Sequence, residues 1–348
     1  MTIVNLIRLT RFAAPLLAAA FAWPLPIAAE TAIHLRLDRK IDGPAAPFFV
    51  AIDRGYFKAE GLDVTVDAAG ADPQDAIKLL TTARYDLAVS DINPLIELRD
   101  QAATAIKAVF VVFDKPPAAI IARKSRGIAA PSDLAGKMLA APSSEPASAL
   151  WPIFAKLNNI DTGQVRVESV GLPVRDPMLA SGEVDAITGC AFTSYIDLKE
   201  RGVPRDDLIV WLMADYGVEL YGDVIMASEN FAAEKPEALR GFLRAYVKAL
   251  KETVRDPGSA IETVLRRSDG AKRETELERL RMAIAENIVT PALRAGGFGA
   301  VDPARFATAL DQLSLTYRFK SKDKASESFD PSFLPPAAER SISNTASR

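Results

Sequence analysis

The chain has 348 residues, of which 49% are hydrophobic and 25% charged, with a formal net charge of -3 and a pI near 5.5. This composition is typical of a soluble globular protein with room for two domain-sized cores, and it excludes disordered and collagen-like classes. A weakly acidic chain has no broad basic surface for nucleic acid or for an anionic membrane, so we expect neither as a partner.

The N-terminal 29 residues have the layout of a secretory signal peptide. Arg8 and Arg11 precede an apolar stretch at residues 12–22, and small residues follow up to Ala28 and Ala29. The apolar stretch is short for a membrane-spanning helix, with an N-terminal membrane anchor as the alternative. We expect cleavage after Ala28 or Ala29 and a periplasmic mature protein.

Two residue counts bear on chemistry, because Cys190 is the only cysteine and His34 the only histidine. A single thiol forms no internal disulfide, and no cysteine stands where a lipid anchor would be attached. A Ser-His-Asp or Cys-His site, or a histidine-rich zinc site, would depend on one histidine. The sequence also has no phosphate-binding glycine motif. We therefore expect no catalytic residues, no metal and no cofactor.

The first predicted unit begins at residue 33. Residues 33–38 and 62–67 alternate apolar and polar side chains, which is the pattern of strands that bury one face. Between them, Pro47 suits the first position of a helix, and the apolar run at residues 48–52 gives that helix a broad buried face. Strand, helix and strand at this spacing predict a parallel βαβ unit.

Further elements of the same kind follow along the chain. Asp72 and Pro73 are placed to begin a helix before a strand at residues 85–90, and Asn93 opens the next helix. Residues 107–113 form an apolar run of strand length, as expected for a strand buried on both faces. The alternation of strands and helices indicates an α/β lobe.

A second series of strand-length apolar runs, each followed by capping residues, begins after Pro117. Asp176 and Pro177, which precede the strand-like "VDAITG", repeat the arrangement of Asp72 and Pro73. The repetition favours two similar lobes over a single large sheet.

The C-terminal part is predicted to be helical and then irregular. From Pro236 to Arg255, apolar side chains recur at helical spacing, and further helices are expected up to Tyr317. Residues 320–348 are polar and interrupted by prolines, which predicts a loosely held tail.

Four segments carry a resemblance to a known family, "APFFVAIDRGYFKAEGLDVTV", "YDLAVSD", "DLAGKMLAAPSSEPA" and "SGEVDAITG". They resemble the successive signatures of the periplasmic solute-binding proteins of ABC importers, in the group that serves sulfonates, taurine, nitrate and thiamine-related pyrimidines. The resemblance covers residues 33–260. It implies a type II periplasmic-binding fold, in which a two-strand hinge joins two Rossmann-like α/β lobes around a ligand. It also implies a monomer that delivers its ligand to a membrane permease with its ATPase.

The resemblance divides the chain into five segments. These are a signal peptide at residues 1–29, the first part of lobe 1 at 30–116, lobe 2 at 117–222, the completion of lobe 1 with the C-terminal helices at 223–319, and the tail at 320–348. The two hinge crossings are expected in "KPPAAIIAR" and "ADYGVELYGD".

The sequence departs from part of this family. In many pyrimidine-binding relatives the loop before the first helix carries a Trp and a His, where this chain has Arg39 and Ala45, and "GCAF" lacks the cysteine-rich run of the fungal pyrimidine synthases. We therefore expect the ligand to be a small organic anion, such as a sulfonate or a carboxylate. A pyrimidine or thiamine-precursor binding protein is the alternative, and an enzyme on the same fold is less favoured. A cytoplasmic effector-sensing domain would carry a helix-turn-helix in place of the signal.

Ligands of open α/β sheets lie beyond the carboxyl ends of the strands, against helix N-termini. Arg175 is expected in a loop at residues 174–176 and is the strongest candidate to grip a carboxylate or sulfonate there, with a solvated surface arginine as the alternative. Ser90 and Ser143 would contact the ligand or only cap helices, and Asp91 would bind an amine or begin its helix. Including an apolar wall, the expected ligand contacts are Arg39, Pro47, Ser90, Asp91, Ser143, Ser144, Arg175, Cys190, Phe192 and Tyr221.

Overall fold

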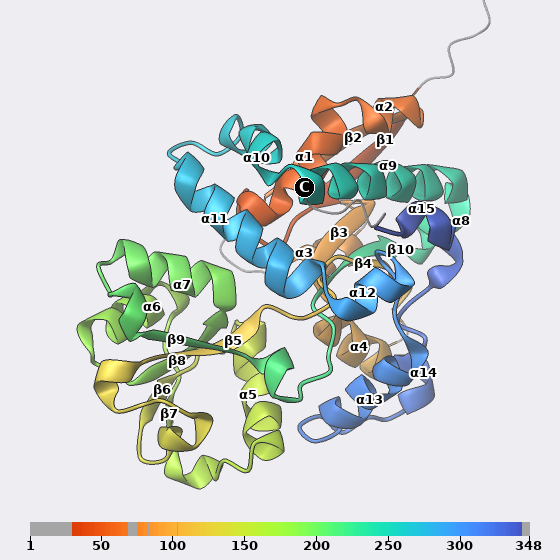
Figure 1. The fold of residues 1–348 in the computed structure, drawn as a ribbon. Coiled ribbons are helices and arrows are strands. Elements are labelled where there is room, and N and C mark those ends of the chain that lie inside the picture. The colour runs from red at the N-terminus through yellow and green to blue at the C-terminus, as the bar shows by residue number, and fades with distance from the viewer. Residues whose placement is uncertain (1–29, 69–74, 83, 103, 343–348) are drawn as a thin grey trace, which may run out of the picture.

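The computed structural model describes residues 30–68, 75–82, 84–102 and 104–342. The predicted signal peptide and the predicted helix start at Asp72 and Pro73 lie outside these residues. Figure 1 shows two lobes, each built on one five-stranded sheet with helices packed around it. The predicted two-lobed α/β fold is confirmed. Within the described ranges, no helix combines the length and the apolar character that crossing a membrane requires.

Lobe 1 contains the sheet with the strand order β2-β1-β3-β10-β4. Its strands are β1 (Thr31–Arg36), β2 (Leu62–Asp67), β3 (Leu87–Asp91), β4 (Ile106–Val111) and β10 (Asp223–Ser228). Its helices are α1 (Ala46–Asp53), α2 (Tyr56–Ala59), α3 (Asp75–Thr81), α4 (Ile92–Gln101), α8 (Glu229–Glu234), α9 (Pro236–Arg255), α10 (Pro257–Leu265), α11 (Arg273–Ala283), α12 (Pro291–Gly296), α13 (Pro303–Leu313), α14 (Lys322–Ser326) and α15 (Ala337–Arg340), with short helical turns at Gly43–Ala45, Ile284–Ile288 and Pro331–Phe333.

Lobe 2 contains the sheet with the strand order β7-β6-β8-β5-β9. Its strands are β5 (Ala118–Arg123), β6 (Met138–Ala140), β7 (Arg166–Glu168), β8 (Ala186–Cys190) and β9 (Leu208–Leu212). Its helices are α5 (Pro146–Leu157), α6 (Leu172–Ser181) and α7 (Ala191–Glu200), with short helical turns at Lys124–Arg126, Pro131–Leu134, Thr162–Gln164, Arg205–Asp207 and Met213–Tyr216.

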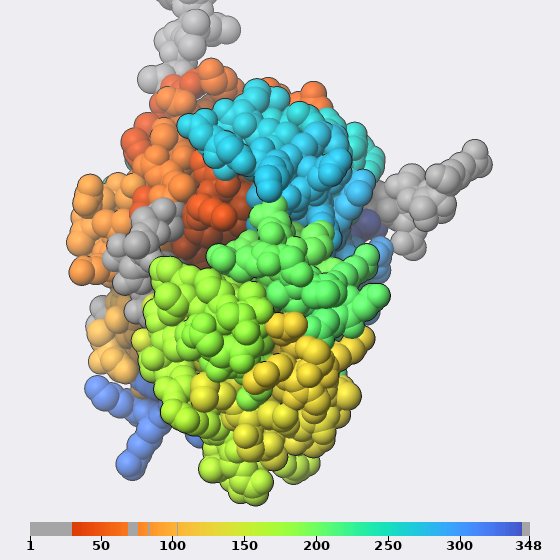
Figure 2. Space-filling model, turned by 90° about the vertical axis from the view of Figure 1, so that its left-hand side faces the viewer, coloured from red at the N-terminus to blue at the C-terminus, as the bar shows by residue number. Residues whose placement is uncertain are grey.

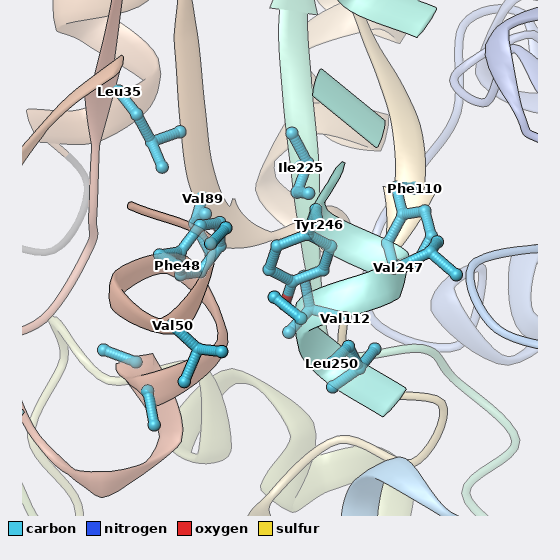
Figure 3. Packing of buried hydrophobic residues seen from close by; sticks show 14 of the residues in the cluster. Leu35, Phe48, Val50, Val89, Phe110, Val112, Ile225, Tyr246, Val247 and Leu250 are labelled. Carbon is cyan, nitrogen blue, oxygen red and sulfur yellow. The ribbon is translucent and has the colours of Figure 1, made fainter. Parts of the chain in front are cut away.

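The first predicted unit is present as expected. β1 and β2 pair in parallel from Thr31 beside Leu62 to Arg36 beside Asp67, and α1 connects them with Pro47 in its first turn. Figure 3 shows how the apolar run of α1 is buried against α9. The ring of Phe48 lies 4.5 Å from that of Tyr246, and Phe110 of β4 meets the same tyrosine edge-on at 5.3 Å. The apolar residues of α1 therefore anchor this helix on the core of lobe 1.

Two segments cross between the lobes, residues 112–117 between β4 and β5 and residues 213–222 between β9 and β10. They are hydrogen-bonded to each other, because Phe113 N–H donates to the carbonyl of Asp223 at 3.0 Å and Gly222 N–H donates to the carbonyl of Phe113 at 3.1 Å. After the crossings, β5 and β10 run antiparallel to their neighbours β8 and β3. The first residues of β5 and β10 consequently stand at the sheet edges where parallel strands end.

The lobes also touch through α11 of lobe 1 and α7 of lobe 2, where the cyan and blue atoms meet the green atoms in Figure 2. Glu200 of α7 accepts hydrogen bonds from the Lys272 ammonium at 3.2 Å and the Thr275 hydroxyl at 3.0 Å. On the same helices, the guanidinium of Arg279 lies 3.6 Å from Asp197. The two lobes are thus in contact at a second place besides the crossings.

The prediction of a loosely held tail is wrong for residues 320–342. Ser328 and Asp330 flank a bridge to β4, in which Ala108 N–H donates to the carbonyl of Ser328 and Asp330 N–H donates to the carbonyl of Ala108, both at 2.8 Å. Further along, the side chain of Arg340 is buried. This polar segment is held by backbone pairing and capping, which apolar periodicity does not reveal.

Candidate functional site

A cleft between the two lobes ends at the crossings and holds a cavity of about 290 Å³, here called the inner compartment. Both lobes and one crossing contribute to its wall. The lining residues are Asp38, Arg39, Lys40, Asp42, Asp91 and Asp223 of lobe 1, Pro116 and Pro117 at the crossing, and Ala118, Ser144, Glu145, Pro146, Ala147, Leu172, Gly189, Cys190 and Thr193 of lobe 2.

Strand topology explains why these side chains meet. Asp91 is the last residue of β3 and Cys190 the last of β8, both at carboxyl ends of parallel strands. Because β10 and β5 run the opposite way, their first residues stand beside those ends, with Asp223 opposite Asp91 and Ala118 opposite Cys190. The inner compartment is therefore formed by strand ends of both lobes and by strand beginnings that follow the crossings.

A second cavity of about 710 Å³, the outer compartment, adjoins the inner one. The two share Asp38, Asp91, Ser144, Glu145 and Pro146 as lining residues, so they form one continuous cleft. The outer compartment is further lined by Ile77, Lys78, Thr81, Ser90, Asn93, Pro94, Glu97, Leu98, Gln101, Ser143, Ala149, Leu150, Leu313, Thr316 and Tyr317.

The inner compartment is rich in carboxyl groups. Five acidic side chains line it, and only two cations, Arg39 and Lys40, lie among the described lining residues. Arg39 is already engaged, since its Nε donates to Asp38 at 3.1 Å and its Nη2 donates to Asp223. The described wall therefore presents hydrogen-bond acceptors and negative charge in excess.

Burial raises the pKa of several of these carboxyl groups. Burial raises the pKa of Asp91 to about 7, although hydrogen bonds from Asn93 oppose this shift. It raises the pKa of Asp42 to about 6, although the charge of Arg39 opposes this shift. Burial also raises the pKa of Asp223 well above its usual value, although Arg39 opposes this shift. Carboxyls in such a state are stabilised as anions only if a donor or a cation reaches them.

Acidic residues stand at the N-cap positions of two helices that face the cleft. Asp91 is the N-cap of α4 and accepts a hydrogen bond from Asn93 N–H at 2.8 Å. Glu145 is the N-cap residue of α5, and burial raises the pKa of its carboxyl. A helix N-terminus attracts an anion through free N–H groups and its positive end. Asp91 already caps α4, whereas Glu145 makes no capping hydrogen bond to α5 and only places a carboxyl beside its N-terminus, and a negative charge at either position disfavours an external anion.

Arg175, the strongest candidate for a ligand contact, lines neither compartment. This residue lies in α6, which begins at Leu172 rather than after Asp176, so Arg175 is in a helix and not in a loop. Its guanidinium is buried and donates to Asp176 at 2.8 Å, to the Ser194 hydroxyl at 2.6 Å and to Glu145. Arg175 therefore lies behind the cleft and fixes Glu145 in its wall.

Gly189 is required where Arg175 approaches β8. A methyl group on this residue would stand 2.6 Å from the Ser194 hydroxyl and 3.4 Å from the Arg175 guanidinium carbon. Only glycine leaves room for that hydrogen-bonded pair beside the strand.

The other expected contacts divide into three groups. Arg39, Asp91, Ser144 and Cys190 line the inner compartment, and Ser90 and Ser143 line the outer one. The remaining three, Pro47, Phe192 and Tyr221, line neither compartment and are buried in helix and core packing.

Tyr221 and Phe192 have clear structural roles. The Tyr221 hydroxyl accepts a hydrogen bond from Asp302 N–H at 2.8 Å, and its ring lies 4.1 Å beneath the Arg305 guanidinium. Phe192 packs edge-on against Phe113 at 6.0 Å. Neither ring forms the expected apolar wall of the cleft.

Among the expected contacts, Cys190 is the residue that carries a thiol. Burial raises the pKa of its thiol to about 11, so the thiol form predominates at neutral pH. Among the described residues, no group of three or more histidines, cysteines and acids is arranged to hold a metal ion. The geometry of the cleft is suited to binding through hydrogen bonds.

The raised pKa of Asp91 leads to a prediction about stability. A group with a higher pKa in the folded state stabilises the protein fully below its unfolded pKa, and this contribution is lost as the pH rises through the folded value. We expect the unfolding free energy of the wild type minus that of Asp91→Asn to fall from pH 4 to pH 7.5. Urea unfolding of both proteins, without ligand, measures it. A constant difference would contradict the raised pKa.

Comparison with known proteins places the chain among relatives that bind small molecules and relatives named as synthases. A family model described as "NMT1/THI5 like" matches residues 44–260. The formylaminopyrimidine-binding protein of Halalkalibacterium halodurans is 28% identical over 73% of this chain and 76% of its own. The riboflavin-binding protein RibY of Chloroflexus aurantiacus is 26% identical over 63% and 62% of the respective chains.

The synthase side is represented by the 4-amino-5-hydroxymethyl-2-methylpyrimidine phosphate synthase of Schizosaccharomyces pombe, 22% identical over 61% of this chain and 62% of its own. Among solved structures, the periplasmic aliphatic sulphonate binding protein SsuA of Escherichia coli superposes with a TM-score of 0.68 and 16% identity, covering 88% of this chain and 94% of its own. The architecture described above is therefore similar to that of a periplasmic binding protein.

Proposed function

Because this chain belongs to the NMT1/THI5-like family and has the two-lobed fold of periplasmic binding proteins, we propose that it is the substrate-binding component of an ABC-type importer. We further propose that its ligand is a small nitrogen heterocycle rich in N–H donors, such as an aminopyrimidine, held in the inner compartment between the lobes.

The excess of acceptors in the inner compartment carries the choice of ligand. An aminopyrimidine presents amino N–H groups to carboxyls such as Asp91 and Glu145, while a ring nitrogen accepts a hydrogen bond from Lys40. Hydrogen bonds of this kind would stabilise the ionised form of carboxyls whose pKa burial raises. The name of the formylaminopyrimidine-binding relative agrees with this class of ligand.

A small organic anion, the ligand expected from the sequence, is less well supported by the cleft. An anion would enter a wall with five carboxyls, whereas Arg39 is paired with two of them and Arg175 lies behind the wall. Like charges in a buried site repel strongly, because little water screens them. We therefore place the heterocycle above the anion.

A thermal-shift screen tests the choice. It would compare 4-amino-5-hydroxymethyl-2-methylpyrimidine, formylaminopyrimidine and riboflavin with taurine, nitrate and an alkanesulfonate at pH 8, where Asp42 and Asp91 ionise. A ligand at a hundred times its Kd adds about 2.7 kcal/mol to the unfolding free energy. We expect shifts from heterocycles only. Stabilisation by the anions alone would restore the expectation drawn from the sequence.

We also propose that the protein binds its ligand without converting it. The raised pKa of the Cys190 thiol and the hydrogen-bonding character of the wall support binding, although some relatives are named as synthases. Mass spectrometry of a heterocycle incubated with purified protein and then released by denaturation is expected to recover the same mass quantitatively. Time-dependent loss of the compound would instead indicate an enzyme.

The remaining parts of the proposal concern place and partners. We propose export to the periplasm after removal of the N-terminal 29 residues, a monomeric state, and delivery of ligand to a membrane permease with its ATPase. In this proposal lobe 1 comprises residues 30–116 and 223–319, onto which the segment 320–342 packs, and lobe 2 comprises residues 117–222. The amino-acid layout of the N-terminus and the fold support it.

A further inference from the structure

Acidic side chains outnumber basic ones in both compartments of the cleft. Glu97 adds a sixth acidic residue to the five of the inner compartment, and Lys78 is the basic residue that the outer compartment adds to Arg39 and Lys40. Arg39 is already paired with two of the carboxyls. Among the described lining residues, six acidic side chains therefore face three basic ones, of which one is engaged.

Two of these carboxyls keep one oxygen open to the cleft. Asp91 accepts both hydrogen bonds from Asn93 at its Oδ1, and Asp223 accepts from Arg39 at its Oδ2. Among the described residues, the second oxygen of each carboxyl has no hydrogen-bond partner. Neither second oxygen is fully enclosed, although both residues are only 5% exposed and both line the inner compartment. Because Asp91 stands opposite Asp223 in the register of β3 and β10, the two open acceptors belong to one part of the wall.

The carboxyls of this wall also repel one another. Burial raises the pKa of Asp223 well above its usual value, and the charges of Asp38 and Asp91 add to this shift while Arg39 opposes it. Burial raises the pKa of Asp91 to about 7, and the charges of Asp38 and Glu97 add to that shift. A positive charge placed between Asp91 and Asp223 would offset the repulsion and stabilise both carboxylates.

The chemistry of the wall favours a nitrogen cation over a metal ion or a neutral donor. Among the described residues, no group of three or more histidines, cysteines and acids is arranged to hold a metal ion. An ammonium group presents three N–H donors, has no acceptor and carries the charge that the carboxyls lack, whereas a hydroxyl presents one donor and no charge. Pro116, Pro117 and Ala118 line the same compartment of about 290 Å³ and offer apolar surface to an organic body.

We propose that the ligand carries an ammonium group that binds between Asp91 and Asp223 in the inner compartment. The N–H groups of the ammonium donate to the open oxygens of both carboxyls, and its charge offsets their mutual repulsion. This inference rests on the proposed function, because it takes the inner compartment as the ligand site. It also goes further, since a heterocycle with only uncharged amino groups would satisfy the proposed function.

Matched pairs of compounds that differ in one group test the charge. Isothermal titration calorimetry at pH 7 would compare 4-amino-5-aminomethyl-2-methylpyrimidine with its 5-hydroxymethyl counterpart, and benzylamine with benzyl alcohol. In each pair that binds, we expect the aminomethyl compound to bind about tenfold more tightly or better than the hydroxymethyl compound. The reason is that hydrogen bonds between charged groups contribute more than those of a neutral hydroxyl.

Substitutions in the wall locate the ammonium group. Asp91→Asn keeps a side-chain oxygen but removes a negative charge, and it is expected to reduce the advantage of the aminomethyl compound to about threefold or less. Asp223→Asn is expected to act in the same direction, which provides a second variant. Asp161 is an exposed residue of lobe 2 outside both compartments, so Asp161→Asn is expected to leave the advantage unchanged.

The outcomes separate this inference from the proposed function. Equal affinity within every pair that binds, or no binding by any of the four compounds, would overturn the ammonium group, and the heterocycle function would then depend on the thermal-shift screen alone. An advantage that survives both Asp91→Asn and Asp223→Asn would overturn the placement between these carboxyls. Tighter binding of benzylamine than of benzyl alcohol, without binding of any heterocycle, would support the ammonium group and reject the heterocycle.

Discussion

Replacing Asp91 with asparagine is expected to weaken binding of an N–H-bearing heterocycle by roughly ten- to hundredfold, since a hydrogen bond to a charged group contributes about 1.5–3 kcal/mol. Asp91 is buried, lines both compartments and stands opposite Asp223 in the register of β3 and β10. Asparagine retains an oxygen that can cap α4 and accept from Asn93, so the fold is expected to persist. Isothermal titration calorimetry with the heterocycle identified by the screen measures the loss.

Asp161→Asn provides the matched control. Asp161 also caps a short helical turn, accepting from Gly163 N–H at 2.9 Å, but it is exposed and lies outside the cleft. The same substitution there is expected to leave ligand affinity unchanged. If Asp91→Asn bound the heterocycle like the wild type, Asp91 would have no part in recognition. If it instead gained affinity for taurine or nitrate, the cleft would be an anion site weakened by its own carboxyls.

Much of the fold is predictable from local patterns in the sequence. The alternation at residues 62–67 and the capping proline Pro47 identify β2 and α1, and the helix predicted from Pro236 to Arg255 coincides with α9. These patterns suffice because each records burial within a single element. The tail has no such pattern, since residues such as Ser328 are buried through backbone pairing to β4.

The candidate site is less predictable, because it depends on strand direction and on contacts between distant segments. A search for carboxyl ends of parallel strands finds Asp91 but passes over Asp223, which begins an antiparallel strand and reaches the same edge after a crossing. Asp38 and Asp42 lie on either side of Arg39 in the sequence, and Glu145 follows Ser144. Acidic residues next to the expected contacts were therefore the signal that could have identified this part of the wall.

Arg175 is a case in which a local sequence pattern predicts the wrong secondary structure. Its chain neighbours Asp176 and Pro177 repeat the helix-starting pattern of Asp72 and Pro73, which predicts a loop at Arg175. In the structure Pro173 lies in the first turn of α6, so the helix begins earlier and Pro177 lies inside it. Pro177 has no N–H group, so the helix lacks one backbone hydrogen bond there. Pro173 is compatible with the first turn of a helix, which allows α6 to begin at Leu172.

Truncation of this arginine, Arg175→Ala, is expected to destabilise lobe 2 by about 3–5 kcal/mol, because it leaves buried carboxyls without their cation. The guanidinium is 4% exposed and is the shared partner of Glu145 and Asp176, and it also holds the Ser194 hydroxyl at 2.6 Å. The denaturation midpoint in urea, measured without ligand, is the readout. Ligand affinity should fall in parallel, since Glu145 would lose the contact that fixes it in the cleft wall.

The control for this loss is Arg166→Ala, which removes an exposed guanidinium that pairs with Glu168 on the surface of the same lobe at 2.6 Å. Surface pairs of this kind contribute about 0–1 kcal/mol, so the control is expected to unfold almost like the wild type. The comparison decides between the two roles of Arg175. A variant Arg175→Ala that unfolds like the wild type but no longer binds taurine or an alkanesulfonate would make Arg175 an anion receptor. Strong destabilisation, with the wild type itself showing no anion binding, would instead place its energetic role in holding the acidic wall together.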